Sequence, residues 1–85
     1  MRRQALARFT LILEFGGGTY IRQVRAALPQ GALRKLAAGT DGKAKLFHAL
    51  ADNGVVAIEG IANCWCSSAS RRGKFALVNI VRTSE

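Results

Sequence analysis

Acidic residues are scarce in this sequence, and the scarcity limits the chemistry that its side chains can carry. Five Asp and Glu stand against thirteen Lys and Arg, with a single His. General acid–base catalysis needs titratable groups held close together. The internal carboxylates are far apart in the chain, at Glu14, Asp41, Asp52 and Glu59, and none is spaced as a hydrolase pair. We therefore expect a protein that is not an enzyme and carries no cofactor.

Cysteine is also rare, and its spacing excludes two common uses. Cys64 and Cys66 are separated by one residue. A disulfide needs Cβ atoms about 3.5–4.5 Å apart, closer than two such positions of a strand. Free thiols favour a reducing compartment, hence the cytoplasm. Structural zinc sites usually have wider cysteine spacing and four ligands, and His48 adds only a third, so two small apolar side chains opposite Trp65 are the simpler interpretation.

Long apolar runs are absent. No stretch approaches the roughly 18 apolar residues of a membrane-spanning helix. Arg2 and Arg3 could begin a signal peptide, but Arg8 and Glu14 interrupt the apolar run and no small-residue cleavage site follows. With 85 residues, of which 49% are hydrophobic, residues 1–85 predict one small basic domain with a single core.

The charge is the strongest signal that is present. The net charge is +8, and Arg outnumbers Lys. Such a field attracts nucleic acid, acidic protein surfaces or anionic lipid, although charge can also serve solubility alone. The densest cluster surrounds a predicted turn over residues 67–73, and Trp65, if it is not a core residue, could stack a base nearby. The predicted partner- or anion-binding residues are Arg22, Arg25, Trp65, Arg71, Arg72 and Lys74.

The N-terminal third predicts a β-hairpin. Residues 8–15 alternate at period two, and residues 19–25 are rich in β-branched and aromatic side chains. Between them, Gly16-Gly17 suits a two-residue turn because Gly tolerates positive φ. A phosphate-binding glycine loop is followed by a helix, whereas a strand follows here. This turn pairs Leu13 with Tyr20, Phe9 with Val24 and Ile12 with Ile21, and a three-residue turn would shift these pairs.

The middle of the chain predicts two helical segments. Pro29 suits a first helical position, and Gly39 suits the end of that helix. Thr40 or Asp41 can cap a second segment that ends at residues 53–54. The two could form a helix-turn-helix, but strands on both sides favour two helices that cover a sheet. The predicted apolar faces consist of Leu28, Ala32, Leu33, Leu36 and Ala37, and of Leu46, Phe47, Leu50 and Ala51.

The C-terminal third returns to strand patterns. Residues 55–63 are apolar and β-branched and predict a third strand, which residues 64–67 continue or follow as a fourth. Residues 75–82 carry apolar groups on both faces, as expected for a central strand. The order ββα(α)βββ predicts an α+β fold, a mainly antiparallel sheet with one or two helical segments packed on one face.

Two segments resemble a known group of proteins. Residues 11–24 read LILEFGGGTYIRQV, and NCWCS at 63–67 is followed by GKFALVNIV at 73–81. Together they resemble small single-domain bacterial proteins of uncharacterised function, with a GGTYI hairpin and a WC…GK-ALVNI ending. The resemblance implies a free-standing α+β domain and no particular activity. Small proteins of this kind are often immunity or inhibitor partners.

These observations predict a small binding protein. The first hypothesis is a protein-binding module of inhibitor, immunity or adaptor type, whose basic surface meets an acidic partner. The alternative is a nucleic-acid-binding protein that contacts phosphates through Arg and Lys. A small open sheet also leaves edge strands, so we expect a possible homodimer through sheet edges, and no membrane partner.

Overall fold

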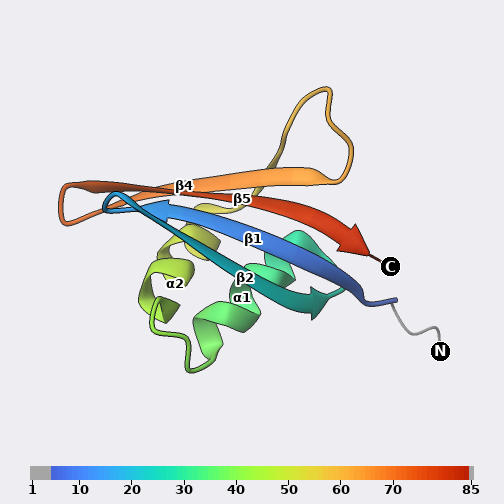
Figure 1. The fold of residues 1–85 in the computed structure, drawn as a ribbon, viewed down its shortest axis with the longest axis horizontal. Coiled ribbons are helices and arrows are strands. Elements are labelled where there is room, and N and C mark those ends of the chain that lie inside the picture. The colour runs from blue at the N-terminus through green and yellow to red at the C-terminus, as the bar shows by residue number, and fades with distance from the viewer. Residues whose placement is uncertain (1–4, 85) are drawn as a thin grey trace.

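The structure, a computed structural model, describes residues 5–84 and forms one five-stranded sheet with two helices. All paired strands are antiparallel, in the order β2-β1-β5-β4-β3. This confirms the predicted α+β fold, and β5 is central as expected (Figure 1). The elements are β1 (Ala7–Phe15), β2 (Gly18–Ala26), α1 (Pro29–Ala38), α2 (Ala44–Asn53), β3 (Val56–Ala57), β4 (Cys64–Arg71) and β5 (Lys74–Ser84).

The β1–β2 hairpin has the predicted register. Gly16 and Gly17 form its two-residue turn with φ of 60° and 82°, a conformation that costs Gly little. The pairs are Leu13 with Tyr20, Phe9 with Val24 and Ile12 with Ile21, as expected. The local turn chemistry and the period-two pattern agree here, which leaves a single register that buries one face.

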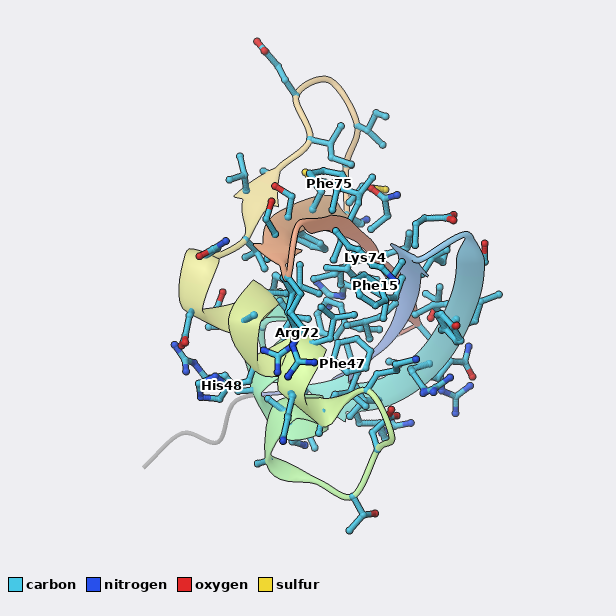
Figure 2. The ribbon with its side chains drawn as sticks, turned by 90° about the vertical axis from the view of Figure 1, so that its left-hand side faces the viewer. Phe15, Phe47, His48, Arg72, Lys74 and Phe75 are labelled. Atoms are coloured by element: carbon cyan, nitrogen blue, oxygen red, sulfur yellow. The ribbon has the colours of Figure 1, made fainter. Side chains whose placement is uncertain are left out.

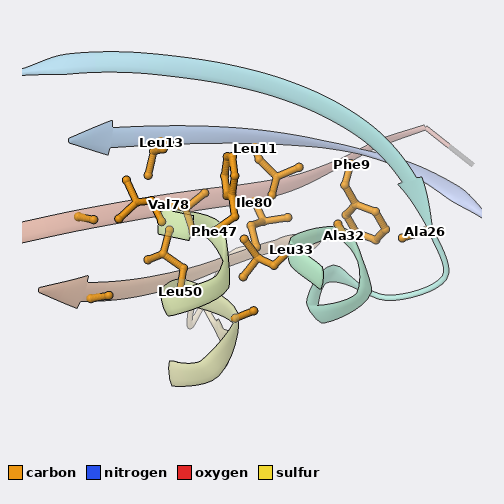
Figure 3. Packing of buried hydrophobic residues seen from close by; sticks show 14 of the residues in the cluster. Phe9, Leu11, Leu13, Ala26, Ala32, Leu33, Phe47, Leu50, Val78 and Ile80 are labelled. Carbon is orange, nitrogen blue, oxygen red and sulfur yellow. The ribbon is translucent and has the colours of Figure 1, made fainter. Parts of the chain in front are cut away.

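Both helices cover the same face of the sheet and enclose the core (Figures 1 and 3). Phe9, Leu11 and Leu13 of β1 are almost fully buried against them. From α2, Phe47 and Leu50 fill the space beneath β1 and β5. The helical apolar faces are as predicted except at Leu28, which is 59% exposed. The remaining buried members of this core are Ala7, Ala26, Ala32, Leu33, Leu46, Ala51, Ala69, Ala76, Val78 and Ile80.

The segment before β4 differs from the prediction. Residues 55–63 do not form a continuous strand: only Val56–Ala57 pairs, with Cys66 and Trp65, and the rest projects as a loop (Figure 1). Gly60 and Asn63 have φ of 83° and 62°, which an extended strand cannot contain. The β-branched composition was therefore misleading here.

The predicted basic turn over residues 67–73 is also shorter than expected. β4 continues to Arg71, and the turn itself consists of Arg72 and Gly73, with φ of 53° and 77°. Ser67 lies in the buried middle of β4 and donates a hydrogen bond to the carbonyl of Leu50 at 2.7 Å. The hairpin register then places Arg71 opposite Lys74.

The two described helices leave the second face of the sheet uncovered. Side chains of alternate positions point there, among them Ile12 and Ile21, a directly opposed pair, and the 62%-exposed Phe75. Figure 2 shows Phe75 and the core residue Phe47 on opposite sides of the sheet. Cys64 and Cys66 share this face, whereas Trp65 points to the helices, as predicted. Within residues 5–84, no helix has the length and apolarity needed to cross a membrane.

Candidate functional site

A basic pocket lies where the β4–β5 turn, the end of β1 and the start of α2 meet. Figure 2 looks onto this end of the molecule, with Phe15, Arg72 and Lys74 labelled near its centre. The pocket has a volume of about 690 Å³. Its walls consist of Phe15, Asp41, Gly42, Lys43, Ala44, Lys45, Leu46, Arg71, Arg72 and Lys74.

Two separate parts of the chain supply the cations of this pocket. The β4–β5 hairpin contributes Arg71, Arg72 and Lys74, because its tight turn places the last residue of β4 beside the first of β5. The start of α2 contributes Lys43 and Lys45. The N-terminus of a helix carries a partial positive charge, which adds to the same field. Five cationic side chains thus surround one hollow.

Asp41, the one carboxylate that residues 5–84 place in the wall, is already engaged. Asp41 accepts hydrogen bonds from Nε of Arg22 and, at 3.3 Å, from its Nη2. The backbone N–H of Lys43 donates to Asp41 Oδ1 at 2.8 Å. The hydrogen bond from Arg22 lowers the pKa of Asp41, and the same contact raises the pKa of Arg22. The prediction that Thr40 or Asp41 caps this helix is wrong, because Lys43 is the N-cap of α2 and no side chain caps the helix. Asp41 instead bonds to the N–H of Lys43 one step earlier and pairs with Arg22 of the sheet.

Among the described residues, the five pocket cations have no such partner. Within residues 5–84 the recorded ion pairs are Arg22 with Asp41 and His48 with Asp52, so no described carboxylate lies within ion-pair distance of the pocket cations. The ammonium of Lys43 instead lies 4.5 Å from the centre of the Tyr20 ring. The negative face of an aromatic ring attracts a cation, so this contact favours one position of the ammonium. The pocket is therefore a concave, positively charged site with room for an anionic group.

Apolar atoms line part of the same hollow. Phe15 is half-buried at the end of β1, and Leu46 is buried in the first turn of α2. Low-polarity walls reduce solvent screening around the cations and strengthen their attraction for an anion. An occupant with both an anionic group and an apolar stem would match these walls.

The structure brings together only some of the predicted site residues. Arg71, Arg72 and Lys74 line the pocket, and Arg22 contributes indirectly by holding Asp41. Arg25 is exposed on the helix-free face of the sheet, opposite Arg8. Trp65 packs edge-on against Phe9, with ring centres 5.9 Å apart. It is six residues from Arg71 along β4, or ~20 Å at the rise of a strand, so the two do not form one site.

Sequence reasoning missed part of the pocket. Lys43 and Lys45 are recognisable as basic residues at a helix start, but nothing local indicates that they face residues 71–74. Phe15 belongs to the alternating face of β1 and reads as a core residue. The signal that could have identified these residues is the pairing of strands, which a single sequence does not display.

Other reactive side chains of the described chain lie elsewhere. His48 and Asp52 are exposed on the outer side of α2, with Nδ1 and Oδ2 3.3 Å apart. No group of three or more His, Cys, Asp or Glu within residues 5–84 is placed to hold a metal ion. Comparisons with protein-family models, curated proteins and solved structures found no match.

Proposed function

We propose that this chain is a non-catalytic protein-binding module, of inhibitor, immunity or adaptor type, that holds an acidic segment of its partner in the basic pocket. The observation that carries the proposal is the gathering of five cations around one hollow, in which the one carboxylate that the described residues supply, Asp41, is already paired to Arg22. An incoming carboxylate can therefore bind cations that are not already paired with an acidic side chain of the described residues.

The electrostatics of the pocket support such a partner. Charges closer than a Debye length, about 8 Å at physiological ionic strength, repel one another, and salt screens this repulsion only in part. The pocket cations come from segments packed around one hollow, so the free protein carries this repulsion. A bound carboxylate relieves it, and the +8 net charge accelerates the encounter with an acidic surface.

The geometry favours a protein acid over a nucleic acid. Phosphate-backbone recognition uses basic residues spread along a track, with aromatic rings on which bases stack. Here Trp65 is packed against Phe9, and Arg25 lies on the other face of the sheet from Arg71 and Lys74. A hollow with apolar walls suits one carboxylate side chain and its stem better than a continuous backbone.

Fluorescence anisotropy with two labelled probes tests the proposal: an oligo-glutamate peptide and a single-stranded oligonucleotide of matched charge. Each is titrated at low and at near-physiological salt. The pocket variant is Arg71→Gln/Arg72→Asn/Lys74→Gln. Because hydrogen bonds to charged groups contribute about 1.5–3 kcal/mol each, the loss of three cationic donors should weaken peptide binding by at least about a thousandfold.

The matched control is Arg34→Glu/Lys35→Gln, which lowers the net charge by the same three units on α1, outside the pocket and outside the sheet. We expect it to weaken peptide binding only slightly. Equal losses in both variants would show generic attraction to a basic protein and would contradict the proposal. Tighter binding of the oligonucleotide at near-physiological salt, with a slope of about −0.9 per phosphate in log affinity against log salt, would favour the nucleic-acid alternative instead.

A further inference from the structure

The helix-free face of the sheet is a second surface with its own composition, and we call it the open face. It consists of the alternate side chains of β1, β2, β5 and β4 that point away from the helices, together with Val56 of β3. Its centre is apolar or uncharged, with Ile12, Ile21, Leu77 and Val81 among its members. Ile21 is 60% exposed, so more than half of this large apolar side chain lies in water in the isolated chain.

The charged side chains of the open face lie at its two ends. Arg8 and Arg25 lie opposite each other at one end, and Glu14 lies beside Thr19 at the other. These three are the charged side chains that the described strands place on it. The remaining described cations lie on the helix side, on the helices or at the turns. The open face is thus the nearly neutral surface of a protein whose net charge is +8.

The Arg8–Arg25 pair is unfavourable in the isolated chain. Like charges directly opposite each other on one sheet face repel. No described carboxylate lies within ion-pair distance of either guanidinium. A carboxylate brought above them from another molecule would remove this repulsion.

The sheet edges are less available than the open face. On the edge strand β2, the carbonyl of Ile21 accepts a hydrogen bond from Nη1 of Arg22 at 3.1 Å, and the carbonyl of Arg25 accepts one from Nζ of Lys35. The other edge, β3, is Val56–Ala57 alone. Side chains that occupy edge carbonyls and very short edge strands both discourage strand addition. This argues against the predicted homodimer through sheet edges and leaves the face as the surface to be covered.

We propose that a second copy of this chain packs on the open face. The two copies are related by a twofold axis that runs between the two sheets, across the strands, and passes near Thr10 and Ile12. Such an axis reverses the strand direction and keeps β1 over β1. It therefore places Glu14 of each copy over Arg8 and Arg25 of the other. An axis parallel to the strands would place Glu14 over Glu14, so the charge pattern selects the first arrangement.

The area of the face is sufficient. Four strands about 4.8 Å apart, with about eight residues each at ~3.3 Å, give a flat area of about 500 Å² per copy. Two copies then bury about 1,000 Å² before the relief of the side chains is counted, which reaches the lower bound of about 1,000 Å² for a specific interface. The basic pocket lies on the helix side, so both copies keep it accessible, and the dimer is independent of the proposed binding function.

Sedimentation velocity of the full chain over a wide concentration range at near-physiological salt tests the proposal. We expect the wild type to sediment as a dimer. Ile21→Lys places an unpaired charge in the interface twice and should weaken dimerisation on the order of a hundredfold. The matched control is Leu28→Lys, because Leu28 is 59% exposed but lies at the start of α1, away from the open face, and it should leave the dimer intact. A monomeric wild type throughout, or equal effects of the two substitutions, would overturn the proposal.

A charge exchange tests the orientation. Glu14→Arg should weaken the dimer, and Glu14→Arg combined with Arg8→Glu should restore it, because the twofold axis brings the exchanged pair together again. Circular dichroism confirms that each variant is folded. Failure of the double variant to recover any affinity would contradict the crossing axis.

Discussion

At the scale of single residues, Asp41 connects the pocket to the sheet. Its carboxylate is only 12% exposed and receives both the Arg22 guanidinium and the N–H of Lys43. These contacts fix the chain between α1 and α2 and place Lys43 over Tyr20. The acidic residue of the pocket wall is thus also the one that positions the start of α2.

Asp41→Asn should lower the free energy of unfolding by about 1 kcal/mol at neutral pH, since a hydrogen-bonded charge pair that is a third exposed on its Arg side contributes modestly. The pKa of Asp41 is lowered in the folded state from its ordinary 3.8. As the pH falls, the unfolded chain therefore binds the proton first. The stabilisation by the pair is complete above the unfolded pKa and is lost as the pH falls through the folded pKa. Urea unfolding across pH should show the wild-type advantage shrinking below about pH 4.

The control for this prediction is Asp52→Asn. Asp52 also forms an ion pair, with His48, but both side chains are more than half exposed, so the substitution should change stability little at neutral pH. Equal stability of Asp41→Asn and the wild type at neutral pH would show that the Arg22 contact does not hold this segment.

At the scale of elements, the two hairpins use the same turn geometry with different residues. Gly16 and Gly17 adopt positive φ freely, whereas the β4–β5 turn places Arg72 at φ 53°. The left-handed conformation costs a non-glycine residue about 1–2 kcal/mol. An arginine at this position lowers stability and places a cation at the rim of the pocket, as expected if that cation binds a partner.

Arg72→Asn should therefore raise the free energy of unfolding by roughly 0.5–1 kcal/mol, because Asn-Gly is the preferred pair for this turn. The same substitution should weaken binding of the oligo-glutamate peptide. Gly73→Ala, at φ 77°, is the opposite control and should destabilise the hairpin. Chemical denaturation measures all three proteins, and a destabilised Arg72→Asn would contradict this account of the turn.

At the scale of the whole molecule, the charges are unevenly distributed. Five cations surround the pocket, while the open face carries charge only at its ends. Self-repulsion destabilises a compact protein and is screened by salt. Each pocket cation should therefore contribute more to the salt dependence of stability than a cation elsewhere on the surface.

A rising sodium chloride concentration should raise the Tm of the wild type, as measured by thermal unfolding. Lys74→Gln should make this dependence shallower, whereas Arg34→Gln, an exposed change of the same charge on α1, should alter it less. Identical salt dependence of the two variants would mean that the pocket cations do not repel one another appreciably.

Local chemistry was enough to predict much of the fold. The period-two face of β1, the Gly16-Gly17 turn and the register of β2 follow from side-chain alternation and backbone sterics. Pro29 and the apolar spacing of α1 and α2 mark the helices in the same way. The apolar groups on both faces of β5 favoured a central place, and β5 lies third in the order of the five strands.

Residues 55–63 and the pocket were decided only by the tertiary structure. Apolar, β-branched residues predict a strand, but a strand exists only where a partner accepts its backbone hydrogen bonds. Here Val56–Ala57 pairs with β4, one more bond runs from the N–H of Ile58 to the carbonyl of Cys64, and the chain then turns away. The pocket joins Lys43 and Lys45 to residues 71–74, which are distant in sequence. Patterns of neighbouring residues determine turns, helices and alternating faces, because these depend on contacts within a few residues. Which charges meet depends on how the strands order themselves, and that order is set by the burial of the whole core.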